Sequence, residues 1–179
     1  LANTEEKYIS FEFGCLKFID SFRFLPTSLD SLANLLNPLV LPKDLEAILT
    51  LKNNKKGIYP YEYIKGISFE DVDKIMDEEK LPPLSAFYSS LSKKNIKDEE
   101  YELALKNWDL LGCTSIRDYT MKYMKLDIYL LSEVFETFRN TCLSNYEIDP
   151  SYCVKAPGLT WLAGLKYTKV NLKYYKQET

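Results

Sequence analysis

The feature that most constrains the fold is a long helical segment predicted from Ser115 to about Cys142. Ser115 is a good helix start because its hydroxyl can form a capping box with Asp118. The apolar residues that follow at helical spacing form one stripe, which consists of Met124, Leu130, Leu131, Val134, Phe135 and Phe138,. The rest of the chain must cover this stripe.

The remaining pattern predicts an α+β fold, with an N-terminal β-hairpin followed by several helices. The hairpin is expected between Tyr8 and Ser21, where two β-rich runs flank Phe13-Gly14,. An extended, tyrosine-rich loop is expected over residues 53–65. Helices are expected from Ser28 to Asn37, for one or two turns after Pro42, and over residues 68–79, 98–111 and 159–166,. In the helix over residues 98–111, Tyr101, Leu105 and Trp108 should face inward, and Gly112 should end it.

Composition excludes several classes of chemistry. The 179 residues include 23 basic and 26 acidic side chains but no histidine, which removes imidazole bases and histidine-based zinc sites,. The four cysteines lie far apart, so we expect reduced, buried thiols in an intracellular protein, whether nuclear, cytoplasmic or mitochondrial,. No apolar run is long enough to span a membrane. The net charge of −3 argues against strong independent binding to DNA,.

Asp127 is the one chemically unusual residue, because it falls within the apolar stripe of the long helix. A buried carboxylate is normally paired with a cation, hydrogen-bonded or bound to a metal. Tyr123 lies one turn earlier on the same face, so both side chains can meet a common ligand,. The alternative is a stripe edge at which Asp127 tilts toward water or pairs with Lys122 or Lys125.

The segment Tyr123-Met-Lys-Leu-Asp127 resembles the third exonuclease motif, Y-x-x-x-D, of family B DNA polymerases. Four other stretches occur in the order found in the protein-primed branch of viruses, linear plasmids and Polinton-type mobile elements: FIDSFRFLPTSLDSLA, KKGIYPYEYI, LPPLSAFYSSL and APGLTW. The resemblance covers nearly the whole chain. It implies DNA replication by a nucleotidyltransferase whose proofreading domain has an RNase H-like fold.

The resemblance also assigns chemistry to individual residues. Two divalent cations, Mg²⁺ or Mn²⁺, would cleave the last phosphodiester of a mispaired primer strand, with Asp127 as a metal ligand. Tyr123 would orient the attacking water or the scissile phosphate. Lys56 would stabilise phosphate charge, although adjacent Lys55 is an alternative and a solvated loop lysine is another interpretation.

Ser21 and Phe22 resemble the motif that holds the single-stranded primer end, with Phe22 in place of the usual leucine. Phe22 can still stack on a base. The alternative is a strand end at which Phe22 and Phe24 belong to the core. For Trp161 in the APGLTW segment a structural role is favoured.

The first two exonuclease motifs and the polymerase motifs do not occur in the sequence. We therefore expect residues 1–145 to be the later part of an exonuclease domain and residues 146–179 to lead toward a polymerase palm. The two-metal site would be incomplete, and the piece inactive by itself. A terminal priming protein would be a partner of the parent enzyme. The competing hypothesis is a non-catalytic helical interaction module, or a domesticated remnant of a mobile element.

Overall fold

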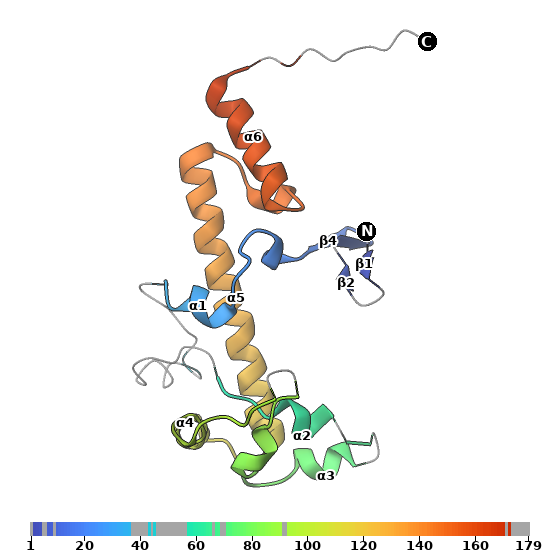
Figure 1. Cartoon of the computed structure of the whole chain (residues 1–179), viewed down its shortest axis with the longest axis vertical. Helices are drawn as coiled ribbons and strands as arrows, with labels where there is room; N and C mark the ends of the chain where they lie inside the picture. Colours follow the sequence, from blue (N-terminus) through green and yellow to red (C-terminus); the bar gives the residue numbers. More distant parts are fainter. Residues whose placement is uncertain are drawn as a thin grey trace. The chain divides into compact units, whose positions relative to one another are not determined.

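The computed structural model describes residues 2–4, 7–8, 10–36, 43, 45, 57–65, 67–68, 71–90, 93–170 and 172. These residues form helices and two small antiparallel sheets, which confirms the predicted α+β class. The chain divides into two compact units, residues 1–28 with 134–179 and residues 29–133. Helix α5 (Ile116–Tyr146) is continuous and contributes to both units (Figure 1).

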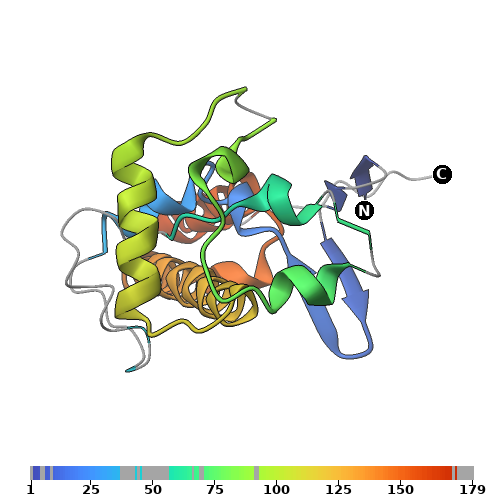
Figure 2. The same ribbon diagram turned by 90° about the horizontal axis from the view of Figure 1, so that it is seen from below.

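The first unit begins with two pairs of short strands. β1 (Ala2–Thr4) pairs with β2 (Lys7–Tyr8), and β3 (Ser10–Phe13) pairs with β4 (Leu16–Ile19). Figure 2 shows the second pair as adjacent antiparallel arrows. The predicted hairpin is therefore confirmed. Gly14 adopts a φ of 60° in the turn, a left-handed conformation that suits glycine,.

An apolar cluster holds the rest of the first unit together. Its buried members are Phe24, Cys142, Cys153 and Leu159. They come from the segment after the short helix η1 (Ser21–Arg23), from α5, from the residue after η4 (Pro150–Tyr152), and from α6 (Ala156–Thr168). Helix α6 is longer than predicted, and Trp161, expected to be structural, is 61% exposed.

The second unit is helical. It contains α1 (Leu29–Ala33), α2 (Tyr61–Lys65), α3 (Val72–Met76), η3 (Leu84–Phe87), α4 (Asp98–Leu110) and the first part of α5. One core cluster joins Ala33 and Leu45 to Leu126 and Leu130 of α5. Another is built from Trp108, Cys113, Ile116 and Tyr119.

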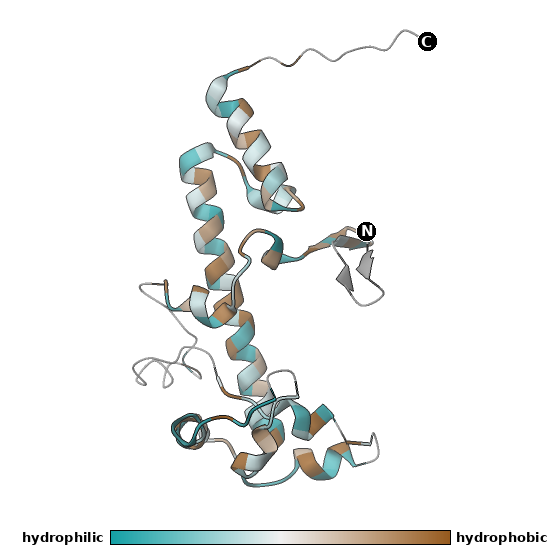
Figure 3. Ribbon diagram, in the orientation of Figure 1, coloured by the Kyte–Doolittle hydropathy of each residue, from teal (hydrophilic) through white to brown (hydrophobic). Residues whose placement is uncertain are grey.

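The long helix is confirmed, but the predicted apolar stripe is partly wrong. Met124 and Leu131 are 52% and 43% exposed. The buried positions of α5 are Ile116, Tyr119, Tyr123, Leu126, Leu130, Val134 and Cys142. They repeat every three or four residues as far as Val134, and Cys142 follows eight residues later on the same face,. Brown and teal residues alternate along the helix in Figure 3, as expected when one face is apolar. Tyr119 and Tyr123 belong to the core face, and the half-buried Asp127 lies beside it.

Several other expectations need correction. Residues 61–65 form α2 instead of an extended loop, and α3 is shorter than the helix predicted over residues 68–79. Leu105 of α4 is 39% exposed, whereas Ala104 and Asn107 are buried. Cys15 is exposed, because it lies in the hairpin turn, while the other three cysteines are buried. The predicted helical turns after Pro42 fall largely outside the described residues.

Candidate functional site

Tyr123 and Asp127 lie one turn apart on α5, and the helix is unbroken between them. The start of the helix is well fixed. The backbone N–H of Asp118 donates to the Ser115 hydroxyl over 3.2 Å, as the capping pattern predicts, and the N–H of Ile116 donates to the carbonyl of Glu78 over 2.9 Å,.

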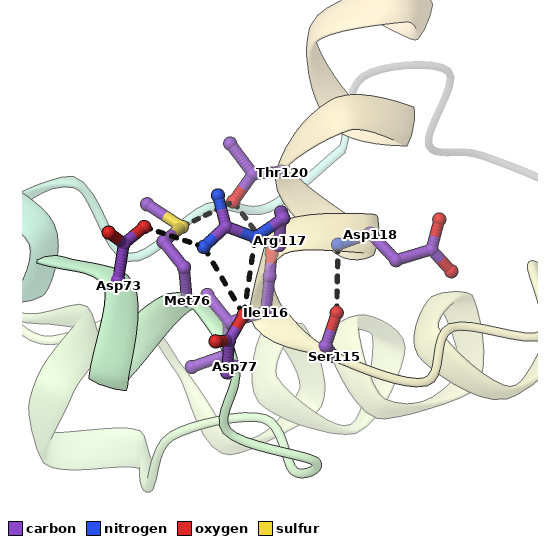
Figure 4. A network of polar contacts seen from close by, with 8 residues as sticks. All are labelled: Asp73, Met76, Asp77, Ser115, Ile116, Arg117, Asp118 and Thr120. Atoms are coloured by element: carbon purple, nitrogen blue, oxygen red, sulfur yellow. Dashed lines mark hydrogen bonds and ion pairs between the residues drawn. The ribbon is translucent and has the colours of Figure 1, made fainter.

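An ion-pair network connects α3 to the same end of α5 (Figure 4). The Arg117 guanidinium donates to Asp73 over 2.8 Å and to Asp77 over 3.2 Å. On the same helix, Thr120 donates to the carbonyl of Ile116 over 2.7 Å. These contacts fix the first turns of α5, and Tyr123 lies in the turn that follows them.

The segment Gly57–Tyr61 folds onto the tyrosine face of α5. The ring of Tyr59 stacks on that of Tyr123 with centroids 4.8 Å apart. The Tyr119 hydroxyl donates to the carbonyl of Ile58 over 2.5 Å, and the hydroxyls of Tyr59 and Thr120 lie 2.9 Å apart. Two stretches separated by about sixty residues in the sequence are thereby joined at one place.

The Tyr123 hydroxyl is engaged at the centre of this cluster. Tyr123 is 6% exposed, and its hydroxyl lies 2.5 Å from that of Tyr61. Its pKa is raised far above the usual tyrosine value, first by burial, then by the bond to Tyr61, and then by the charge and hydrogen bond of Asp127,. The hydroxyls of Tyr61 and Tyr123 share one hydrogen bond, in which either can be the donor. Asp127, whose carboxylate can only accept, extends this group on the other side of the Tyr123 hydroxyl,.

Asp127 is half-buried, and its Oδ1 atom is shielded from solvent. Lys122, one of the lysines considered as its partner, instead donates to Asp118 over 2.8 Å and to the carbonyl of Leu111 over 2.7 Å. The carboxylate therefore sits at the edge of the tyrosine cluster, within reach of the Tyr123 hydroxyl.

Carboxylate oxygen is the ligand type that Mg²⁺ and Mn²⁺ prefer, so Asp127 suits a divalent metal by its chemistry. Within the described part of the chain, however, no three carboxylate or thiol side chains gather as metal ligands would. The described residues do not make up a metal site by themselves.

Lys56 and Lys55 lie outside the described residues, but Gly57, which follows Lys56 in sequence, lies so near the ring of Tyr123 that an added Cβ atom would be 2.7 Å from Cδ2. Ser21 and Phe22 belong to the other compact unit. Ser21 opens η1 and is half-buried, Phe22 is 58% exposed, and Phe24 is 6% exposed. The alternative interpretation places both phenylalanines in the core. It is correct for Phe24 and wrong for Phe22.

The sequence interpretation missed the involvement of Tyr59 and Tyr61. Both were assigned to an extended loop, although aromatic residues two apart in Tyr59-Pro-Tyr61 were a visible signal. Their role depends on contacts with α5, which local propensity does not encode.

Comparison with known proteins identifies the class. Residues 3–163 match the family model of DNA polymerase type B, organellar and viral. The chain belongs to this family of type B DNA polymerases. It is also 26% identical over 134 residues to a "Probable DNA polymerase" from Podospora anserina, which covers 74% of this chain but 9% of that relative.

Comparison with solved structures gave no match. Among the helices that the structure describes, none is both long and apolar enough to cross a membrane.

Proposed function

We propose that this chain is part of the 3′-to-5′ proofreading exonuclease domain of a protein-primed DNA polymerase that replicates a virus-like or mobile element. The family match supports a polymerase, and the domain would have an RNase H-like fold completed by residues outside these 179. Because the chain spans only 9% of its Podospora relative, most of such an enzyme would lie elsewhere.

The observation that carries the proposal is the chain of side chains Tyr61, Tyr123 and Asp127. It joins the Y-x-x-x-D motif to the segment that begins directly after Lys56. Tyr123 is 6% exposed, Asp127 is half-buried and Tyr61 is 56% exposed, so the hydroxyl of a core tyrosine is connected to polar groups that lie near the surface. Such an arrangement is more typical of a site that positions a polar ligand.

In the proposed site, Asp127 supplies one carboxylate ligand and residues outside the described set supply the others. Bound Mg²⁺ or Mn²⁺ would activate water and stabilise the leaving 3′ oxygen. Tyr123 would orient the water or the scissile phosphate, and Lys56 would offset phosphate charge. To contact the water or the phosphate, the Tyr123 hydroxyl must give up its hydrogen bond with Tyr61 or with Asp127.

The proposed partner is the single-stranded end of the primer. Ser21 would donate to its phosphate, and the exposed ring of Phe22 would stack on a base,. A terminal priming protein would bind the whole polymerase. The 179-residue chain alone should bind DNA weakly, because its net charge is −3,.

The test compares Asp127→Ala with Asp109→Ala in the full-length polymerase that contains this chain. Asp109 is an exposed carboxylate on α4 and serves as the matched control. We expect Asp127→Ala to reduce excision of a labelled primer by at least about 100-fold while DNA synthesis continues, because polymerisation uses separate carboxylates. Asp109→Ala should change neither activity. Unimpaired excision by Asp127→Ala would instead favour the helical interaction module.

Lys56→Ala should cause a partial loss of excision, since a cation assists phosphate cleavage without being a metal ligand. Lys55→Ala is the control that distinguishes the two neighbouring lysines. If Lys55→Ala alone lowered excision, the role would move by one residue. The purified 179-residue chain should not degrade the primer with either metal.

A further inference from the structure

Among the glycines that the structure describes, Gly57 is the one at which an added side chain would collide with the Tyr123 ring. A methyl group placed on its Cα would lie 2.7 Å from Cδ2 and 3.0 Å from Cε2 of Tyr123. Carbon atoms that are not bonded normally stay about 3.5–4.0 Å apart. The backbone of Gly57 is outside the left-handed region, so an alanine there would suffer only this collision,.

The segment that contains Gly57 is held on α5 and cannot easily retreat. The Tyr119 hydroxyl binds the carbonyl of Ile58 over 2.5 Å, and the Tyr59 hydroxyl lies 2.9 Å from that of Thr120. Both anchors lie within two residues of Gly57. A side chain at position 57 would therefore push against the ring of Tyr123 before it could move the backbone.

The ring of Tyr123 has little room on its other sides. Tyr59 stacks on it, Tyr61 approaches it edge-on with centroids 6.1 Å apart, and Leu126 also lies against this contact. Any displacement of the ring moves the hydroxyl that contacts Tyr61 and Asp127. Tyr123 itself is 6% exposed, so little empty space beside its ring can absorb the shift,.

We propose that Gly57 is a positioning residue for the exonuclease reaction: the absence of a side chain there lets the Tyr123 ring adopt the orientation in which its hydroxyl meets Asp127. This inference rests on the proposed proofreading function. It adds a requirement that motif spacing does not contain, namely that the residue after Lys56 must be glycine because of a ring sixty-six positions later.

The experiment is a double-mutant cycle in the full-length polymerase, with Gly57→Ala and Tyr123→Phe separately and together. Gly57→Ala should lower the excision rate at saturating primer on the order of 10-fold, because a small misplacement of a catalytic group is costly. In the Tyr123→Phe background the same change should have little further effect, because no hydroxyl remains to be displaced. A merely structural role would give the same loss in both backgrounds and would overturn the proposal.

Gly164→Ala is the matched control, because a methyl group there meets no atom within 4 Å. It should leave excision unchanged. Amide hydrogen exchange over residues 57–61 reports whether this segment still folds onto α5 in each variant. If Gly57→Ala does not fold, Tyr119→Phe, which frees the carbonyl of Ile58, replaces it in the same cycle, and additive losses there would also overturn the proposal.

Asp127→Ala distinguishes failure of the proposed proofreading function from failure of the proposed role of Gly57. If Asp127→Ala leaves excision intact, the proposed function is wrong. If Asp127→Ala abolishes excision but Gly57→Ala does not lower it, the function stands and the role of Gly57 is wrong.

Discussion

The two halves of α5 are buried by different chemistry. The first half packs Tyr119 and Tyr123 against Tyr59, with hydroxyls hydrogen-bonded inside the cluster. The second half packs Phe135, Phe138 and Cys142 against Phe24 and Leu159. Arg139 on this half forms an ion pair with Asp149 over 2.7 Å. An apolar core needs no internal hydroxyls. Under the proposed function, the hydrogen-bonded hydroxyls of the first half position chemical groups, whereas the second half stabilises the fold.

The largest expected effect in this comparison is on the apolar half. Phe24 is 6% exposed and contacts both Phe135 and Phe138. Phe24→Ala should lower the free energy of unfolding by about 3–5 kcal/mol, because it leaves a cavity among these rings. Chemical denaturation followed by circular dichroism measures this loss.

Phe22→Ala is the matched control for Phe24→Ala. Its ring is 58% exposed, so the free energy of unfolding should change by less than about 0.5 kcal/mol,. Equal losses for the two variants would contradict the assignment of Phe24 to the core and of Phe22 to the surface.

In the tyrosine half, single changes should be smaller. Tyr123→Phe removes one hydroxyl but keeps the stacked ring, so the unfolding free energy should fall by about 1 kcal/mol,. Amide hydrogen exchange should show the loss of protection in the Gly57–Tyr61 segment first. If protection fell instead in α6, the cluster would not depend on this hydroxyl.

The two halves should also respond to opposite ends of the pH range. Burial raises the pKa of Tyr119 and Tyr123, so the stability they contribute is complete below about pH 10, the ordinary tyrosine value, and declines as the pH rises above it,. Arg139 lowers the pKa of Asp149, so the stability that this carboxylate contributes is complete above about pH 4 and declines as the pH falls,.

Two variants separate these responses in a series of thermal midpoints against pH. Tyr123→Phe should flatten the alkaline side of the profile and leave the acid side unchanged. Asp149→Asn should do the reverse. If either variant flattened both sides, the two halves of α5 would not be chemically distinct.

The sequence predicts those elements whose signals are local. Ser115 and the apolar spacing define α5, Gly112 ends α4 with a φ of 59°, and Phe13-Gly14 defines the hairpin turn. The five-residue helix α2 was missed because so short a helix depends on packing more than on its own sequence,.

The candidate site was predictable only in part. Y-x-x-x-D was visible, but the core face of α5 was misassigned, because Tyr119 and Tyr123 were not counted as its apolar members. The amphipathic nature of tyrosine explains the error, since its ring packs in the core while its hydroxyl remains a polar group. The contact between Gly57 and Tyr123 requires long-range packing, which no local pattern contains.

Under the proposed function, Asp127 serves excision of a mispaired primer end and not DNA synthesis. The most direct measurement is the ratio of mispair excision to correct extension in the full-length polymerase carrying Asp127→Asn, which removes the charge but nearly preserves the volume. We expect excision to fall by at least about 100-fold with extension unchanged, so that the ratio falls by the same factor. An unchanged ratio, whether both rates persist or both decline together, would contradict the claim.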